Sequence, residues 1–264
     1  MSDLPFHKAR KRFGQNFLHD HSIIQRISRS INPKPGDRMV EIGPGQGALT
    51  EYMLEGAGGL DVIELDRDLI PTLKLRFGLN KAFRIHEGDA MKFDFASLKT
   101  DERPLRVVGN LPYNISTPLI FHLLGFQGMI SDMHFMLQKE VVLRLAAQAG
   151  DKHYGRLGIM TQYYCAVDYL FTVGPDAFKP APKVDSAIVR LTPHKTLPHP
   201  CKDVQMLEVV VRDAFSQRRK TIRNTLKNHM SADELESLGI DSGARPEVLL
   251  LADFVRIADY LITR

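Results

Sequence analysis

The sequence lacks several features that would place it in a specialised class of protein. It has no tryptophan and only two cysteines, Cys165 and Cys201, which form no CxxC pair and so indicate neither a disulfide framework nor a zinc site. No apolar run approaches the roughly 18 residues of a membrane span. No apolar stretch follows the charged first dozen residues, so no secretory leader is expected and we predict a cytoplasmic protein.

Metal-ligand spacing is also missing. Ten histidines are present, two of them in His19-Asp20-His21, but no HExxH or comparable arrangement occurs, so we expect no metal ion. What the chain does have is 264 residues, of which 44% are hydrophobic. This is enough for one large domain with its own core and a smaller one.

Positive charge gathers in two segments, although the net charge of the chain is only +4. Residues 1–12 hold four basic side chains against one acidic, and residues 212–227 hold six against one. Clustered charge of this kind indicates a polyanion such as RNA, and the alternative is two solvated basic faces. The side chains that we expect to bind RNA are Lys8, Arg10, Lys11, Arg12, Arg218, Arg219, Lys220 and Arg223.

Strand-like and helix-like patterns alternate from residue 36 to about residue 192. Short apolar runs predict strands at 38–43, 60–65, 83–88, 106–110, 133–138, 156–165, 170–173 and 186–191. Helical spacing occurs at 46–56, 66–77, 118–125 and 139–149, the third helix with Ser116 or Thr117 as its N-cap and Pro118 at its first position. Such alternation predicts an α/β fold with a mostly parallel sheet, which binds ligands at the carboxyl ends of its strands.

The pattern changes after the proline-containing stretch 190–201. Residues 203–264 show only helical periodicity, with Gly239 and Gly243 separating the later pieces. We therefore expect two domains. The first is an α/β domain with a basic N-terminal arm at 1–192, and the second is a small all-helical C-terminal domain at 193–264.

A glycine-rich turn follows the first strand of the expected sheet. "VEIGPGQG" (40–47) places Gly43 and Gly45 after a strand and before a helix, where glycine permits a tight turn and the close approach of a ligand. Glu64 ends the second strand about twenty residues later, and Asp89 ends the third. A carboxylate at the first place can accept both ribose hydroxyls of an adenosine, and one at the second can accept the adenine amine. Singly, each feature is also typical of a structural turn or a helix N-cap.

The end of the fourth strand, "VVGNLPYNIST" (107–117), distinguishes two cofactors that contain adenosine. The Asn110 side-chain oxygen and the Leu111 backbone oxygen are suited to accept both hydrogens of an aromatic amine, and Pro112 restricts Leu111 to extended conformations. Tyr113 offers a flat face for the base. This favours transfer from the sulfonium of S-adenosylmethionine by positioning, rather than hydride transfer with NAD. The alternative is a strand that ends in a turn, with Tyr113 in the core.

A second aromatic side chain is expected on the other side of the base. "FKPAPKVDS" (178–186) holds Phe178 next to two prolines, which leave the loop little freedom. Enzymes that act on a base take it out of its stack and enclose it between apolar side chains. We predict this role for Phe178, with packing of the loop on the core as the alternative.

These motifs, in this order, resemble the rRNA adenine N6,N6-dimethyltransferases, and most closely the group that acts on the small subunit. The resemblance rests on "RFGQNFL" (12–18), "EIGPGQG" (41–47), "IELD" (63–66), "GDA" (88–90), "GNLPYNIST" (109–117), "FKPAPKVDS" (178–186) and "FSQRRKTIRN" (215–224). It implies a Rossmann-like class I methyltransferase fold with a seven-stranded sheet. It also implies dimethylation of two adjacent adenines near the 3′ end of small-subunit rRNA, late in the assembly of that subunit.

The resemblance also assigns residues. It implies that Asn16 and Leu18 line the S-adenosylmethionine site, that Gly43 and Gly45 lie at the methionine part, that Glu64 binds the ribose, Asp89 the adenine, and that Asn110 contacts both cofactor and target amine. It implies a C-terminal domain that contacts the backbone of rRNA. We expect the chain to act as a monomer.

Three other functions stay open at this point. The erythromycin-resistance methylases share the Asn-x-Pro-Tyr and proline-loop motifs but act on large-subunit rRNA. A non-catalytic assembly factor on the same fold would bind RNA without methylating it. An NAD-dependent dehydrogenase is disfavoured because we find no site for hydride transfer.

Overall fold

The computed structural model describes residues 15–217 and 219–264, so Lys8, Arg10, Lys11, Arg12 and Arg218 lie outside the described residues. The chain divides into two compact units. The first contains the described residues up to Val142 together with Asp168–Pro193, and the second contains Leu143–Val167 and the described residues of His194–Arg264. Residues 143–167, which we assigned to the α/β domain, therefore group with the C-terminal helices.

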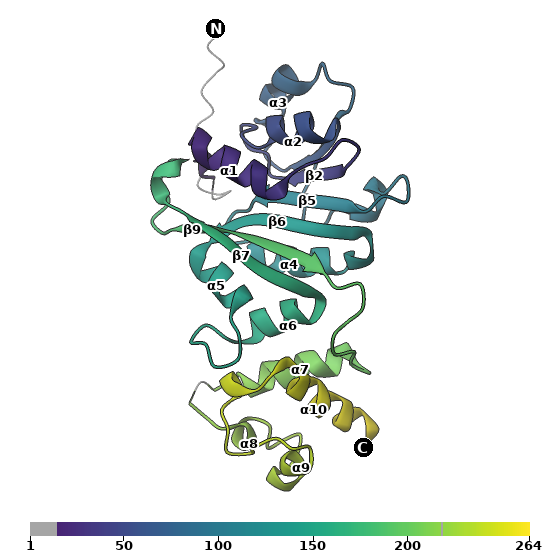
Figure 1. The fold of residues 1–264 in the computed structure, drawn as a ribbon, viewed down its shortest axis with the longest axis vertical. Helices are drawn as coiled ribbons and strands as arrows, with labels where there is room; N and C mark the ends of the chain where they lie inside the picture. Colours follow the sequence, from purple (N-terminus) through teal and green to yellow (C-terminus); the bar gives the residue numbers. More distant parts are fainter. Residues whose placement is uncertain (1–14, 218) are drawn as a thin grey trace. The chain divides into compact units, whose positions relative to one another are not determined.

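A seven-stranded sheet forms the centre of the first unit (Figure 1), with the strand order β4-β3-β2-β5-β6-β9-β7. The seven strands are β2 (Arg38–Ile42), β3 (Leu60–Glu64), β4 (Phe83–Glu87), β5 (Leu105–Asn110), β6 (Ile130–Gln138), β7 (Cys165–Val173) and β9 (Ser186–Pro193). The pairs from β4 to β6 are parallel, and β9 is antiparallel to β6. The expected mostly parallel α/β sheet is confirmed.

The remaining elements of the first unit connect or flank these strands. They are β1 (Phe17–Leu18), α1 (His21–Ile31), α2 (Thr50–Ala57), α3 (Ile70–Phe77), the 3-10 turn Phe95–Leu98, α4 (Ser116–Leu124), the 3-10 turns Gln127–Met129 and Pro175–Ala177, β8 (Phe178–Lys179) and the beginning of α5 (Lys139–Ala146). The His19-Asp20-His21 motif has a local role here. Asp20 is the N-cap of α1, because its carboxylate accepts from Ser22 N and Ile23 N.

The strand order reverses between β2 and β5, which lie side by side in the sheet (Figure 1). β3 and β4 continue the sheet on one side and β6 on the other. A parallel sheet opens a crevice for ligands where its order reverses, outside the carboxyl ends of the strands. Glu64 and Asn110 are the last residues of β3 and β5, and Gly43 and Asp89 follow β2 and β4 within two residues, so all four lie at the carboxyl ends of this parallel part.

The helix after β5 begins earlier than expected. α4 begins at Ser116 after Ile115, and neither Ser116 nor Thr117 caps it with a side chain. The Ser116 hydroxyl donates instead to the Tyr113 carbonyl at 3.2 Å. This hydrogen bond links the first residue of α4 to the turn that precedes the helix. Pro118 is thus the third helical residue, a position whose N–H has no acceptor inside the helix.

The second unit is helical where we predicted a late strand. Residues 156–165 were expected to be extended, but Arg156–Tyr164 forms α6. Its buried side chains, including Ile159, Met160 and Tyr163, join the core of the C-terminal helices. A short apolar run does not distinguish a buried strand from a buried helix, and the prediction of a strand at 156–165 was wrong.

Five further elements complete the second unit. They are α7 (Val204–Ala214), α8 (Ile222–Thr225), α9 (Ala232–Ser237), the 3-10 turn Pro246–Val248 and α10 (Leu251–Thr263). α7 and α10 contribute Leu207, Val210, Phe254 and Ile257, all fully buried, to one core. None of the helices in the described ranges is both long enough and apolar enough to span a bilayer.

Candidate functional site

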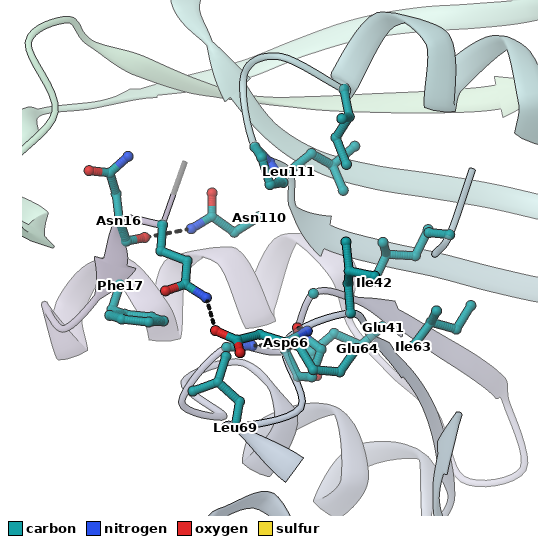
Figure 2. Close-up of a pocket in the computed structure, with 18 of the residues that line it drawn as sticks. Asn16, Phe17, Glu41, Ile42, Ile63, Glu64, Asp66, Leu69, Asn110 and Leu111 are labelled. Atoms are coloured by element: carbon teal, nitrogen blue, oxygen red, sulfur yellow. Dashed lines mark hydrogen bonds between the residues drawn. The ribbon is translucent and has the colours of Figure 1, made fainter. Parts of the chain in front are cut away.

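A pocket of about 340 Å³ lies at the carboxyl ends of β2, β3, β4 and β5. All the residues that we expected at the site, the basic residues aside, line it. They are Asn16, Leu18, Gly43, Gly45, Glu64, Asp89, Asn110, Leu111, Pro112, Tyr113 and Phe178. Segments far apart along the chain, from Asn16 to Phe178, therefore meet at a single cavity, and Figure 2 labels ten of its lining residues.

The glycine turn has a backbone that other residues rarely adopt. Gly43 and Gly45 have φ angles of 64° and 58°, in the left-handed region that favours glycine. A Cβ added to Gly45 would lie 3.2 Å from the Phe17 ring. The turn thus needs glycine both for its conformation and for the side chain that covers it.

Glu64 and Asp89 present carboxylates to the pocket. Glu64 is 5% exposed and accepts from Asp66 N at 2.7 Å and Gly45 N at 3.4 Å. Burial raises the pKa of Glu64, and these backbone hydrogen bonds oppose the shift. Asp89 accepts from Met91 N at 3.0 Å. Neither residue is the N-cap of a helix, but both carboxylates also accept backbone N–H groups in the turns that follow β3 and β4.

A third acid, Glu41, was missed by the sequence analysis. It is 2% exposed in β2, lines the pocket, and accepts a hydrogen bond from the Thr50 hydroxyl at 2.7 Å. Burial raises the pKa of Glu41 to about 7, although the Thr50 hydrogen bond opposes the shift. The signal was present in "VEIG", because an acid inside a buried strand needs a specific reason.

Asn110 is fixed by the backbone of the N-terminal segment. Its side-chain nitrogen donates to the Asn16 carbonyl at 3.1 Å. A carbonyl can only accept, so it selects the amide nitrogen and turns the Asn110 oxygen away, as Figure 2 shows. The oxygen that the sequence analysis expected to accept from a target amine is thus not used by Asn16.

Leu111 and Pro112 form the turn after β5. Leu111 is 1% exposed and its N–H donates to Met136 O at 3.2 Å, which ties the turn to β6. Pro112 O accepts from Ile115 N at 3.2 Å. Within the described part of the chain, no hydrogen bond to the Leu111 carbonyl occurs. Tyr113 is half-buried at the pocket rather than in the core.

Residues 15–18 form a strap across the pocket. Gln15 donates to an Asp66 carboxylate oxygen at 2.8 Å, and β1 pairs antiparallel with β8, placing Leu18 opposite Phe178. His19 N donates to Ala177 O at 3.0 Å. The strap joins the segment after β3, the glycine turn, Asn110 and Phe178. Asn16 and Leu18 were expected from the resemblance, whereas Gln15 and Phe17 were missed.

Three of the predicted RNA-binding residues belong to the second unit. Arg219, Lys220 and Arg223 are exposed in the second unit, between α7 and α9. None of the three forms an ion pair in the described residues, whereas Arg212 pairs with Asp213 at 2.8 Å. Residues 15–217 and 219–264 hold no group of three or more His, Cys, Asp or Glu that could bind a metal ion.

Comparison with solved structures supports this fold. A dimethyladenosine transferase from Plasmodium falciparum superposes with a TM-score of 0.77 and 28% identity, covering 91% of this chain and 95% of that one. The 23S rRNA methyltransferase ErmE superposes with a TM-score of 0.75 at 24% identity, covering 94% of this chain and 100% of that one. The second likeness shows the fold alone.

Sequence comparison is more specific. "Ribosomal RNA small subunit methyltransferase A" of Marinobacter nauticus is 64% identical over 261 residues, which cover 99% of this chain and 94% of that protein. The protein of the same name from Pseudomonas fluorescens Pf0-1 is 66% identical over 255 residues, covering 97% and 94%. The model of the family described as "Ribosomal RNA adenine dimethylase" matches residues 6–263. The match to the family model extends over nearly the whole chain, including the strap and the helical unit. The chain belongs to the ribosomal RNA adenine dimethylase family.

Proposed function

We propose that the chain transfers methyl groups from S-adenosylmethionine to the N6 amines of two adjacent adenines near the 3′ end of small-subunit rRNA, during late assembly of that subunit. The observation that carries this proposal is the placement of Asn110 at the pocket, with its amide nitrogen bound to Asn16 O. The names of the relatives support the small subunit as substrate.

The charge of the pocket suits a cationic cofactor. Its charged side chains, among the described lining residues, are all carboxylates: Glu41, Glu64, Asp66 and Asp89. Such a pocket repels the pyrophosphate of NAD and attracts the sulfonium and ammonium of S-adenosylmethionine. We assign the ribose to Glu64, the adenine amine to Asp89, and the methionine part to Gly43 and Gly45, with Asn16 and Leu18 at the side of the strap.

Bound S-adenosylmethionine supplies an electrophilic methyl group. The chain's task is to make a weakly nucleophilic aromatic amine attack it in line. The Asn110 oxygen and the Leu111 carbonyl accept hydrogen bonds from the N–H groups of the amine, which localises its lone pair toward the methyl group. As the nitrogen bonds to the methyl carbon, the carbon–sulfur bond breaks, and the nitrogen then releases one proton to water. One N–H remains to be held in the second transfer. Tyr113 stacks on the base. Phe178 packs in the core of the first unit, as the alternative for this loop predicted, but it also lines the pocket, and we assign it to the other face of the base.

The basic segments serve the rRNA in this proposal. Arg219, Lys220 and Arg223 are exposed on the second unit and suited to contact phosphates without reading sequence. Lys8, Arg10, Lys11, Arg12 and Arg218 are assigned the same role from the sequence. The partner is an immature small ribosomal subunit in the cytoplasm, and we propose that one copy of the chain is sufficient.

The test is methyl transfer to small subunits isolated from cells without this mark and, in parallel, to large subunits, followed by mass spectrometry of both rRNAs, including the 3′ region of the small-subunit rRNA. We expect four methyl groups on two adjacent adenines. Methylation of large-subunit rRNA instead would support the erythromycin-resistance alternative, and binding without transfer would support an assembly factor.

A variant separates binding from transfer. Asn110→Ala should lower the rate by roughly 10²–10³-fold, because a donor or acceptor aimed at the reacting atoms has an effect of this size. Its Kd for the cofactor product S-adenosylhomocysteine should rise far less. Asn80→Ala, which loses an amide that accepts from Ala82 N at 2.9 Å on the surface, is the matched control. Normal methylation by Asn110→Ala would refute the role of Asn110.

A further inference from the structure

The proline loop ends in a serine to which no role has been given so far. Ser186 is the first residue of β9 and is 1% exposed. It pairs with Gln138, the last residue of β6, so the sheet fixes its backbone. Ser186 therefore lies at the start of an inner strand with a fixed backbone, although the loop of residues 178–185 precedes it.

The Ser186 hydroxyl touches the aromatic residue at the pocket. Its Oγ lies 3.1 Å from the Tyr113 phenol oxygen, and either atom can donate. The Ser116 hydroxyl donates to the carbonyl of the same tyrosine at 3.2 Å. Tyr113 is thus held at its backbone by the start of α4 and at its far end by β9, while it lines the pocket.

We infer that Ser186 is a positioning residue for methyl transfer, which acts through the Tyr113 phenol to fix the plane on which the target adenine stacks. This inference rests on the proposed function. A half-buried phenol ring turns about two side-chain torsions. A hydrogen bond at its oxygen fixes the first torsion, and it biases the second, which sets the ring plane, because the phenol C–O–H group prefers to lie in that plane. A base stacked on a ring of fixed plane presents its amine along one direction, as transfer in line with the sulfonium requires.

A purely structural role for the hydroxyl makes a different prediction. A buried hydroxyl needs a hydrogen-bond partner in any protein, and under this alternative Tyr113 serves that need alone. The loss of the hydroxyl would then lower the free energy of unfolding, and kcat of the folded variant would stay at the wild-type value. A double-mutant cycle separates the two roles, because residues that act through one contact give non-additive losses.

The cycle consists of Ser186→Ala, Tyr113→Phe and the double variant, assayed on unmethylated small subunits. Each single variant removes one side of the same hydrogen bond, so each should lower kcat by a similar factor of about three to ten. The double variant should lose about as much as either single one. KM for the subunit and Kd for S-adenosylhomocysteine should change by less than about twofold, because the ring plane affects the reacting complex alone.

Ser30→Ala is the matched control, since its hydroxyl donates to Ile27 O at 2.7 Å in α1, away from the pocket. Multiplied losses in the double variant, or an unchanged rate for Tyr113→Phe, would overturn the inference. If Ser186→Ala fails to fold, Tyr113→Phe still decides, because it leaves Ser186 in place. An inactive wild-type protein would overturn the proposed function and this inference together, whereas an active one with additive losses would overturn only the inference.

Discussion

Charged side chains near the amino-terminal ends of the parallel strands are paired with one another, whereas Glu41, Glu64 and Asp89 near the carboxyl-terminal ends line a cavity. The exposed Glu87 at the end of β4 pairs with Arg67 instead. Arg106, the second residue of β5, binds Asp132 at 2.8 Å and Asp37 at 2.6 Å. Arg84 binds Asp61 at 2.5 Å. At the other end, no lysine or arginine of the described residues forms an ion pair with Glu41, Glu64 or Asp89.

This difference indicates which charges serve the fold and which serve a ligand. Paired charges at one end satisfy each other, and burial of Asp132 is outweighed by its contacts with His134 and Arg106, which lower its pKa to about 2. At the other end burial prevails and raises the pKa of both Glu41 and Glu64. Carboxylates that are buried without a cation beside a cavity are expected where a cationic ligand binds.

The largest expected effect is on stability, at the paired end. Arg106→Met leaves Asp37 and Asp132 without their cation, and removing one partner of a partly buried pair should lower the free energy of unfolding by about 3 kcal/mol. Urea unfolding measures this change, and the Kd for S-adenosylhomocysteine of the folded variant should stay the same.

The control for Arg106→Met is Arg103→Met, which removes an exposed pair with Asp101. The fall in the free energy of unfolding should be much smaller for Arg103→Met, because solvent screens exposed ion pairs. Equal losses from the two variants would show that the position of Arg106 in the sheet adds nothing to its pairing.

The next effect is a pH dependence that has opposite signs at the two ends. The pKa of Glu41 is raised from 4.5 to about 7 in the folded chain, so the stabilising protonated form is lost as pH rises through about 7. Glu41→Gln keeps an acceptor for Thr50 and should gain roughly 2–3 kcal/mol relative to the wild type between pH 5 and pH 8.

Asp132 gives the opposite sign, because its lowered pKa stabilises the fold above its ordinary value of 3.8. That contribution is lost as pH falls through about 2. Asp132→Asn should therefore flatten the acid limb of the stability curve, whereas Glu41→Gln flattens the neutral one. Urea unfolding as a function of pH checks both variants. A stability difference between Glu41→Gln and the wild type that stays constant from pH 5 to pH 8 would contradict the assignment.

A smaller effect concerns binding at the cavity end. Glu64→Gln removes the charge but keeps one acceptor, so Kd for S-adenosylhomocysteine should rise by about 10- to 100-fold, the loss expected for hydrogen bonds to a charged group. The Tm of Glu64→Gln should not fall, because burial already disfavours the charged form of Glu64 in the folded chain. Calorimetry and thermal unfolding measure the two quantities. A large fall in Tm with an unchanged Kd would show that Glu64 stabilises the fold and does not bind the ligand.

How much of this arrangement the sequence predicts depends on the range of the interactions. The ends of β2, β3, β4 and β5 follow from local patterns, and so do the residues after them, because parallel strands bring their carboxyl ends together. Asn16 and Leu18 followed only from the family resemblance. Gln15, Phe17, Glu41 and Ser186 were missed, since their partners Asp66, Gly45, Thr50 and Tyr113 are known only from the folded chain.

The weakest effect that we predict concerns the strap. Gln15→Leu removes the hydrogen bond of 2.8 Å to Asp66 and should weaken the attachment of residues 15–18 by about 1 kcal/mol. Because Asn16 O holds Asn110, both cofactor affinity and transfer rate should fall, each by about three- to tenfold. Hydrogen exchange of the amides of residues 16–19 should rise in parallel, since those amides lose a constraint.

Gln25→Leu, an exposed position on α1, makes the same substitution without touching the strap. A strap that couples the two halves of the pocket predicts that Gln15→Leu changes binding and transfer together. If Kd for S-adenosylhomocysteine rises while kcat stays at the wild-type value, the Asn16 carbonyl does not depend on Gln15. The orientation of the Asn110 amide would then be a property of β5 and of β1 pairing with β8, and the two halves of the site would be fixed separately.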